Sequence, residues 1–342
     1  MDSKNVLMAI VLSTLVLIVW ATFFEPPPIE KKITENENLV SKSEEVSSPS
    51  SEETSSPSIE DTKSSKKVTR NEAIRETSRV NLENASIRGS ISLKGAVIDD
   101  ITFKDYKASL DSEEKVIFLN PKNSSEGYYI ETGWAASNYE KLKLPLASTV
   151  WKVIGNNTLT PNNPVVLEWS NNEGLIFTKK IELDDKFLFK ITQSIKNTSN
   201  RSYEFFPYAQ ITRNYKPDVM RIYILHEGFI GMFNDELMEK NYKDIEEKKF
   251  STNSSKGWLG ITDKYWLTAI VPEKGKKFKS EFLVSDEKYK ANFIIKQPTT
   301  LEPNTSATNE IKAFVAAKEV AVIDNYAEKL GIEKFDLAID WG

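Results

Sequence analysis

The sequence contains no cysteine and only one histidine, and these two shortages exclude much of ordinary enzyme chemistry. Without cysteine the chain has no disulfide, no thiolate nucleophile and no cysteine-based zinc, haem or iron–sulfur site. One histidine, His226, excludes any metal site that needs two imidazoles. The 342 residues carry a formal net charge of −5, which argues against a nucleic-acid-binding protein because such proteins need clustered positive charge.

The common catalytic motifs are missing as well. The chain has no G-x-S-x-G, no P-loop and no dinucleotide-binding fingerprint. Residues 226–230 approach the H-E-x-x-H zinc motif but lack its second histidine. A lone histidine in an apolar-flanked turn is more often a structural hydrogen-bonding group than a catalytic one. The sequence therefore predicts a protein that is not an enzyme and that uses no metal and no cofactor.

The first 24 residues predict a membrane anchor. Residues 6–24 contain no charge, and a helix of this length covers roughly 28 Å, close to the thickness of a bilayer's hydrocarbon core. A cleaved signal peptide is the competing interpretation, but the apolar stretch runs past the small-residue site near residue 21. The side chains expected in the bilayer include Val6, Leu12, Leu17, Trp20 and Phe24.

Residues 25–79 predict a disordered tether. Nine of the 18 residues from 41 to 58 are serine, mixed with glutamate and proline, and such a composition cannot bury a core. Charge is segregated along the tether, with ten acidic and three basic residues over 25–62 and then two acidic and six basic over 63–79.

Residues 80–312 predict a mainly β domain. Short β-branched and aromatic segments alternate between apolar and polar residues and are separated by Asn, Gly, Pro and Asp. Residues 175–183 and 187–195 are the clearest pair, joined at 184–186. Because no regular strand–helix alternation occurs, the pattern favours an antiparallel sandwich or barrel.

The last segment, 313–342, predicts an amphipathic helix followed by an apolar run. Ala316, Val320, Ile323, Ala327 and Leu330 recur at helical spacing, and Gly331 suits the end of the helix. We expect a second apolar set to lie poorly buried and to face a membrane or a further domain, in a fragment of a longer chain. This candidate docking set is Phe335, Leu337, Ile339 and Trp341.

Three segments are the most distinctive of the domain, at 207–213, 224–231 and 257–267, and the last two place glycine beside bulky side chains. Glycine at such positions permits tight turns or close backbone packing. The residues that define these segments are Gly228, Gly231, Gly257, Trp258, Gly260, Asp263 and Trp266.

Together with the block at 89–96 and the closing run at 317–320 and 330–342, these segments resemble the periplasmic region of the Oxa/YidC/Alb family of membrane protein insertases. The resemblance implies a cytoplasmic amino terminus, an inner-membrane anchor and a large periplasmic β-supersandwich shared with aldose epimerases. It implies as partners the lipid bilayer, nascent inner-membrane proteins and the Sec translocon with its accessory subunits. The insertase groove would belong to a transmembrane core beyond residue 342. The alternative is a membrane-tethered periplasmic β-sandwich that binds carbohydrate or peptide.

Overall fold

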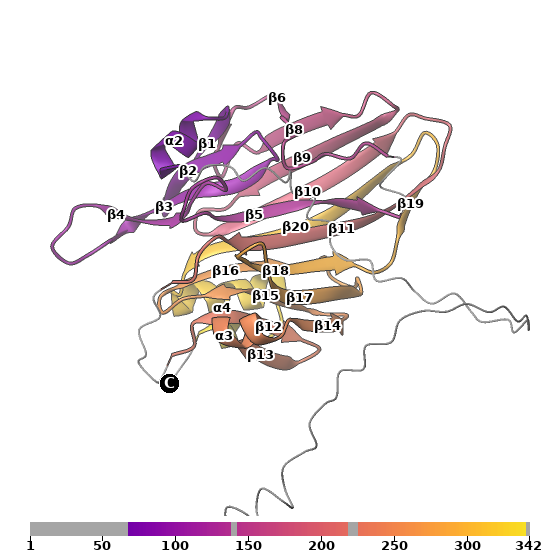
Figure 1. The fold of residues 1–342 in the computed structure, drawn as a ribbon. Helices are drawn as coiled ribbons and strands as arrows, with labels where there is room; N and C mark the ends of the chain where they lie inside the picture. Colours follow the sequence, from indigo (N-terminus) through magenta and orange to yellow (C-terminus); the bar gives the residue numbers. More distant parts are fainter. Residues whose placement is uncertain (1–67, 138–141, 218–224, 340–342) are drawn as a thin grey trace, which may run out of the picture. The chain divides into compact units, whose positions relative to one another are not determined.

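The computed structural model describes residues 68–137, 142–217 and 225–339, and these residues form two large β-sheets with four short helical segments (Figure 1). Every pairing between the described strands is antiparallel except that of β1 with β7. The predicted anchor, with Val6, Leu12, Leu17, Trp20 and Phe24, and most of the tether lie outside the described residues. Within the described ranges, no helix is long and apolar enough to cross a membrane.

The first sheet has eleven strands, nine of them on one continuous path. β19 pairs with β11 and β4 pairs with β3 beside that path. In sheet order the strands are β14 (Phe250–Ser254), β17 (Phe278–Ser285), β18 (Lys288–Ile295), β11 (Tyr203–Arg213), β5 (Tyr128–Ala136), β3 (Val97–Lys107), β2 (Ile87–Ser92), β1 (Arg79–Glu83) and β7 (Thr158–Leu159), with β19 (Thr299–Leu301) and β4 (Lys115–Leu119) at the side.

The second sheet has nine strands and packs against the first (Figure 1). In sheet order they are β13 (Glu236–Lys240), β12 (Gly228–Phe233), β15 (Gly257–Thr262), β16 (Trp266–Val271), β20 (Ser306–Ala317), β10 (Leu188–Asn197), β9 (Leu175–Leu183), β8 (Val165–Ser170) and β6 (Lys152–Ile154). The helical segments are α2 (Arg70–Arg75), α3 (Tyr242–Glu247), α4 (Val320–Leu330) and the 3₁₀ helix η2 (Phe335–Ala338).

The core between the sheets follows from the period-2 pattern of the strands. In β10 and the residue before it, Phe187, Phe189, Ile191, Gln193 and Ile195 are all buried, as their alternation predicts. One apolar cluster joins these side chains to those of the facing sheet. The expected antiparallel β-supersandwich is therefore confirmed, and the predicted strand at 175–183 coincides with β9.

The outer face of the nine-stranded sheet carries a second apolar cluster, and α4 and η2 cover it. Successive residues of one strand divide between the two clusters: Ala313 and Val315 of β20 face the first sheet, whereas Phe314 faces the helix. Because the sheet is apolar on both faces here, it needs a cover on each side.

The amphipathic helix is confirmed, but its expected start and stripe are partly wrong. Ala316 belongs to β20, which continues to Ala317, and Val320 is 40% exposed. The helix instead buries Ile323 and Tyr326. The predicted helical stripe began too early, inside β20, because alanine and valine fit both the 3.6-residue period of a helix and the two-residue period of a strand. Gly331 ends α4 in the left-handed conformation, with φ of 60°, as its position predicts.

The ordered domain begins before residue 80. The helix α2 lies within the segment expected to be tether, and a capping box between Thr69 and Glu72 starts it. The composition of this short segment gave no sign of order, because its partners are charged side chains far along the chain.

Two polar side chains cross the sandwich interior. Lys179 of β9 donates a hydrogen bond to the carbonyl oxygen of Thr132 at 2.6 Å, and Gln193 of β10 donates to that of Gly133 at 3.0 Å. The ammonium of Lys179 also lies 5.1 Å from the ring centroid of Trp151. Burial lowers the pKa of Lys179 to about 8, although the charge of Glu131 opposes the shift.

Replacing Ile323 by Asp should lower the free energy of unfolding by about 3 kcal/mol or more, because a charge would enter a fully buried apolar contact. The matched control is Val320→Asp, in the first turn of the same helix. Its side chain is 40% exposed, and a carboxylate there suits the helix dipole, so we expect a change below about 1 kcal/mol. Chemical denaturation of both variants measures the difference, and equal losses would contradict the packing described.

Stability should rise between pH of about 8 and about 9.5 because of Lys179. Its pKa is about 8 in the folded protein against the ordinary lysine value of 10.5 in the unfolded chain, so the unfolded chain binds more protons in this window. We expect a gain of about 2 kcal/mol, which Lys179→Met should remove. Lys180→Met, at the neighbouring and exposed position, should keep the rise. Urea denaturation across this pH range tests both variants, and a flat profile for the unmodified protein would contradict the shift.

Candidate functional site

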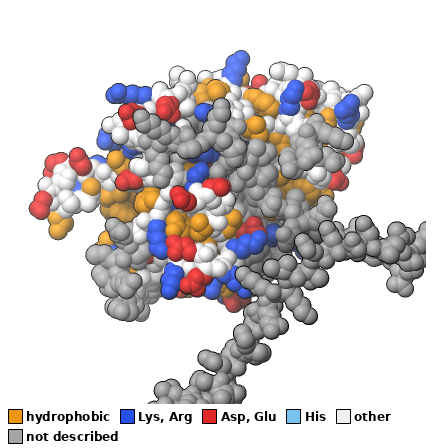
Figure 2. Space-filling view, in the orientation of Figure 1, with side chains coloured by type: hydrophobic (Ala, Val, Ile, Leu, Met, Phe, Trp, Pro, Cys, Tyr) orange, Lys and Arg blue, Asp and Glu red, His pale blue; other side chains and the backbone are white. Residues whose placement is uncertain are grey.

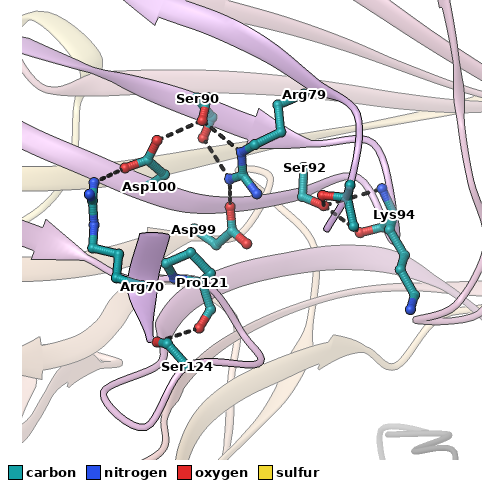
Figure 3. Close-up of polar contacts among 10 residues, drawn as sticks. Arg70, Arg79, Ser90, Ser92, Lys94, Asp99, Asp100, Pro121 and Ser124 are labelled. Atoms are coloured by element: carbon teal, nitrogen blue, oxygen red, sulfur yellow. Dashed lines mark hydrogen bonds and ion pairs between the residues drawn. The ribbon is translucent and has the colours of Figure 1, made fainter. Parts of the chain in front are cut away.

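The chain enters the sandwich through a cluster of two arginines and two aspartates. Arg70 of α2 forms an ion pair with Asp100, and Arg79 of β1 forms one with Asp99 (Figure 3). Ser90 joins the two pairs, since it accepts a hydrogen bond from Nε of Arg79 at 2.7 Å and donates one to Asp100 at 2.6 Å. Burial raises the pKa of Asp99 to about 6 despite the opposing effect of Arg79. These contacts hold the first described residues onto β2 and β3.

The chain leaves the sandwich through η2, which is held by aromatic packing. Phe335 is fully buried, and its ring centroid lies 5.2 Å from that of Trp258 and 4.6 Å from that of Phe314. The expectation that Phe335 would be poorly buried is therefore wrong. It failed because the outer face of the nine-stranded sheet needs cover, which the strand pattern alone did not reveal.

The other members of the expected docking set differ from Phe335. Leu337 and Ile339 are half-buried and pack at the border of the outer cluster. Trp341 lies outside the described residues. Leu337 and Ile339 thus keep part of their surface available for a contact outside the sandwich.

Polar contacts fasten the same segment at two further points. Lys256 forms ion pairs with Asp235 and Glu333, both at 2.8 Å. Because Asp235 lies between β12 and β13 and Glu333 lies just before η2, Lys256 connects that hairpin to the terminal segment. The hydroxyl of Tyr326 donates to Asp184 at 2.5 Å and accepts a hydrogen bond from the backbone N–H of Phe187 at 3.2 Å.

The segments at 224–231 and 257–267 contribute strands beneath this cover, whereas 207–213 lies in β11 of the other sheet. At Gly257, with φ of 129°, an added Cβ would lie 1.7 Å from the carbonyl oxygen of Met232. At Gly260 it would lie 2.1 Å from that of Thr268. Close packing of β12, β15 and β16 therefore needs glycine at these positions. Gly228 and Gly231 lie in β12, the neighbouring strand.

Asp263 takes part in a buried ion pair between the two sheets. It accepts a hydrogen bond at 2.8 Å from Nη1 of Arg213, whose side chain is 6% exposed. Arg213 also donates to the hydroxyls of Tyr242 and Tyr215. Trp266 faces the interior between the sheets and stacks on Phe103, with ring centroids 4.9 Å apart, whereas the next residue, Leu267, belongs to the outer cluster.

His226 has a structural contact, since its Nε2 lies 2.9 Å from the carbonyl oxygen of Phe229. Among the described residues no group of three or more His, Asp or Glu side chains is placed to hold a metal ion. Charged side chains of both signs are interspersed over the face drawn in Figure 2.

A cleft of about 770 Å³ opens at the start of β11. Its lining is mostly polar, and Tyr203 is the one aromatic side chain in it. The lining residues that carry charge are Glu173, Arg201 and Glu204.

Several residues that organise the domain were not singled out from the sequence. Arg70, Arg79, Lys179 and Arg213 are the main ones. The one signal that could have revealed a buried charge is a long basic side chain on the apolar face of an alternating strand, as at Lys179 and Arg213. Their partners are distant in sequence, so the pairs themselves could not be found without the structure.

Comparison with known proteins gives a consistent result. The family model described as the YidC periplasmic domain matches residues 79–342. The membrane protein insertase YidC of Pelagibacter ubique is 46% identical over 344 residues, covering all of this chain and 59% of the relative. That of Bradyrhizobium diazoefficiens is 35% identical over 368 residues, with the same two coverages. The chain thus spans about three-fifths of the length of these curated relatives.

Among solved structures, a galactose mutarotase related enzyme from Lactobacillus acidophilus has a TM-score of 0.49 and 12% identity, and covers 70% of this chain and 98% of its own. The resemblance suggested by the glycine-rich segments and the closing run is confirmed by the family match and by the full-length relatives. The chain belongs to the YidC periplasmic domain family.

Proposed function

We propose that this protein acts in the insertion and folding of inner-membrane proteins, as a membrane protein insertase. The observation that carries the proposal is the alignment of the whole chain with relatives named membrane protein insertase YidC, at 46% identity in one case. An insertase lowers the free-energy cost of moving polar segments of a client into lipid by offering a hydrated path within the bilayer. No covalent step on a substrate is part of this function.

In this proposal, residues 1–24 anchor the chain in the inner membrane with a cytoplasmic amino terminus, and residues 25–67 tether the domain. The domain described above lies in the periplasm. Its two fastened ends support a positioning role, because both the entering and the leaving chain are held by buried contacts rather than by loose loops. The domain is thereby a rigid body between its two connections.

The domain would also dock partners, among them nascent clients and the Sec translocon with its accessory subunits. Leu337 and Ile339 support a contact next to the exit of the chain, because each is only half-buried. Phe335 is left out of this surface, since the sandwich itself buries it.

A second candidate function is the binding of a polar ligand, carbohydrate or peptide. The cleft at the start of β11 favours it, because a volume of about 770 Å³ and a polar lining with one tyrosine suit a hydrophilic ligand. Binding of a ligand there would be compatible with the insertase function, since the cleft and η2 are built from different elements.

The complete protein should restore growth and the insertion of a single-span client in a bacterium depleted of its own insertase. Leu337→Ala with Ile339→Ala should reduce insertion several-fold if these side chains contact a partner, because they lose apolar surface. Asp336→Asn, at the exposed position directly before Leu337, is the control and should insert normally. Failure of the complete protein to support insertion, at normal expression, would refute the proposed function.

The topology can be tested by cysteine labelling because the chain has no natural cysteine. A cysteine at Asn157, which is exposed in the domain, should react with a membrane-impermeant maleimide in cells whose outer membrane has been opened. A cysteine at Ser3 should react only after the inner membrane is also disrupted. The reverse pattern would show that the orientation is inverted.

A further inference from the structure

A group of four exposed lysines lies at one end of the sandwich, and we refer to it as the basic loop. Lys274, Lys276 and Lys277 occupy the turn between β16 and β17, and Lys296 directly follows β18. All four are exposed, and none forms an ion pair with another described residue. Glu273, the one carboxylate within the turn, accepts a hydrogen bond from Asn309 at 2.7 Å instead.

The backbone holds these lysines together. The turn is closed by a hydrogen bond from the N–H of Lys276 to the carbonyl oxygen of Glu273 at 3.3 Å, and Gly275 adopts φ of 82° at its tip. The N–H of Lys296 donates to the carbonyl oxygen of Lys277 at 2.9 Å, so these two lysines face each other across adjacent strands. Lys274 points toward the end of α4, where its Nζ would lie 3.7 Å from a Cβ placed on Gly331.

This arrangement is unfavourable for the isolated domain. Like charges directly opposite each other on neighbouring strands repel. Some lysines on the same domain are compensated, as Lys190 is by Glu182 and Glu310, at 3.5 and 3.6 Å. An uncompensated cluster of one sign in a chain with a net charge of −5 therefore indicates an anionic partner.

We propose that the basic loop docks onto the headgroups of anionic phospholipids in the membrane to which the domain is tethered. The inference rests on the proposed function only for that tethering. Lysine carries a strongly hydrated point charge on a flexible stem. This side chain is better suited to a layer of mobile phosphate groups than to a single fixed carboxylate partner. None of the large hydrophobic side chains that are exposed among the described residues lies in this loop. A protein partner would need such an anchor at the centre of its contact, whereas a lipid surface does not.

The contact should depend on lipid charge and on salt. Each lysine near an anionic surface increases membrane partition by about fivefold at physiological ionic strength. The Debye length falls from about 8 Å at 0.15 M salt to about 3 Å at 1 M, so high salt should release the loop.

The experiment uses the full chain in lipid nanodiscs, and a single cysteine at Gln297, which is exposed beside Lys296, carries a fluorophore. Spin-labelled headgroups quench the fluorophore when it lies at the membrane surface. Quenching should be strong in discs that contain phosphatidylglycerol, weak in phosphatidylcholine alone, and reversed by 1 M salt as estimated above. The same fluorophore at Asn157, in the turn before β7, is the control for general proximity and should be quenched little in either lipid.

Replacing all four lysines of the basic loop by glutamine should abolish the lipid-dependent quenching. The matched control replaces four other exposed lysines, Lys107, Lys152, Lys196 and Lys243, and has the same net charge. It should behave like the unmodified protein. The proposal would be overturned by quenching that does not depend on phosphatidylglycerol, by equal quenching at Asn157, or by an equal loss of quenching in both quadruple variants.

Loss of a crosslink to an acidic protein in the basic-loop variant, without any lipid-dependent quenching, would also overturn it and would identify a protein partner instead. The outcome is separable from that of the proposed function. A protein that supports insertion without quenching would refute the lipid contact alone, and quenching without insertion would refute the insertase function alone.

Discussion

The nine-stranded sheet has apolar side chains on both of its faces around β12, β15, β16 and β20, and the rest of the domain is built around this constraint. One face is covered by the eleven-stranded sheet. The other face would expose Trp258 and Phe314 to water if α4 and η2 did not pack on it. Residues 320–338 are therefore part of the folded domain.

Polar groups inside the sandwich connect its two sheets. Lys179 and Gln193 satisfy backbone carbonyl groups of β5 from the opposite sheet, and Asp263 pairs with Arg213 across the same interior. Each of these contacts costs desolvation, so their value lies in fixing how the two sheets face each other more than in added stability. Arg70 and Arg79 do the same for the entering chain.

A domain with both ends held in this way is suited to positioning rather than to chemistry. In the insertase role proposed above, a domain held at both ends would limit where a client meets the hydrated path. Charge on its surface can add a preferred orientation to the bilayer without any change in the fold. The buried contacts at its two ends hold the first and last described segments on the sandwich.

The sequence by itself determined several of the strands, the class of fold and the family. Alternation in 175–183 and 187–195 defined β9 and β10 because side-chain periodicity is a local property, and glycines such as Gly257 marked close backbone contacts. The sequence also indicated α4 and its terminal Gly331. Only the tertiary structure decided that Phe335 is core, that Val320 is surface, and that α2 belongs to the domain. Each of these depends on partners that are distant along the chain, such as Trp258 for Phe335 and Asp100 for Arg70. No local sequence pattern encodes such a contact, because only folding brings the two residues together.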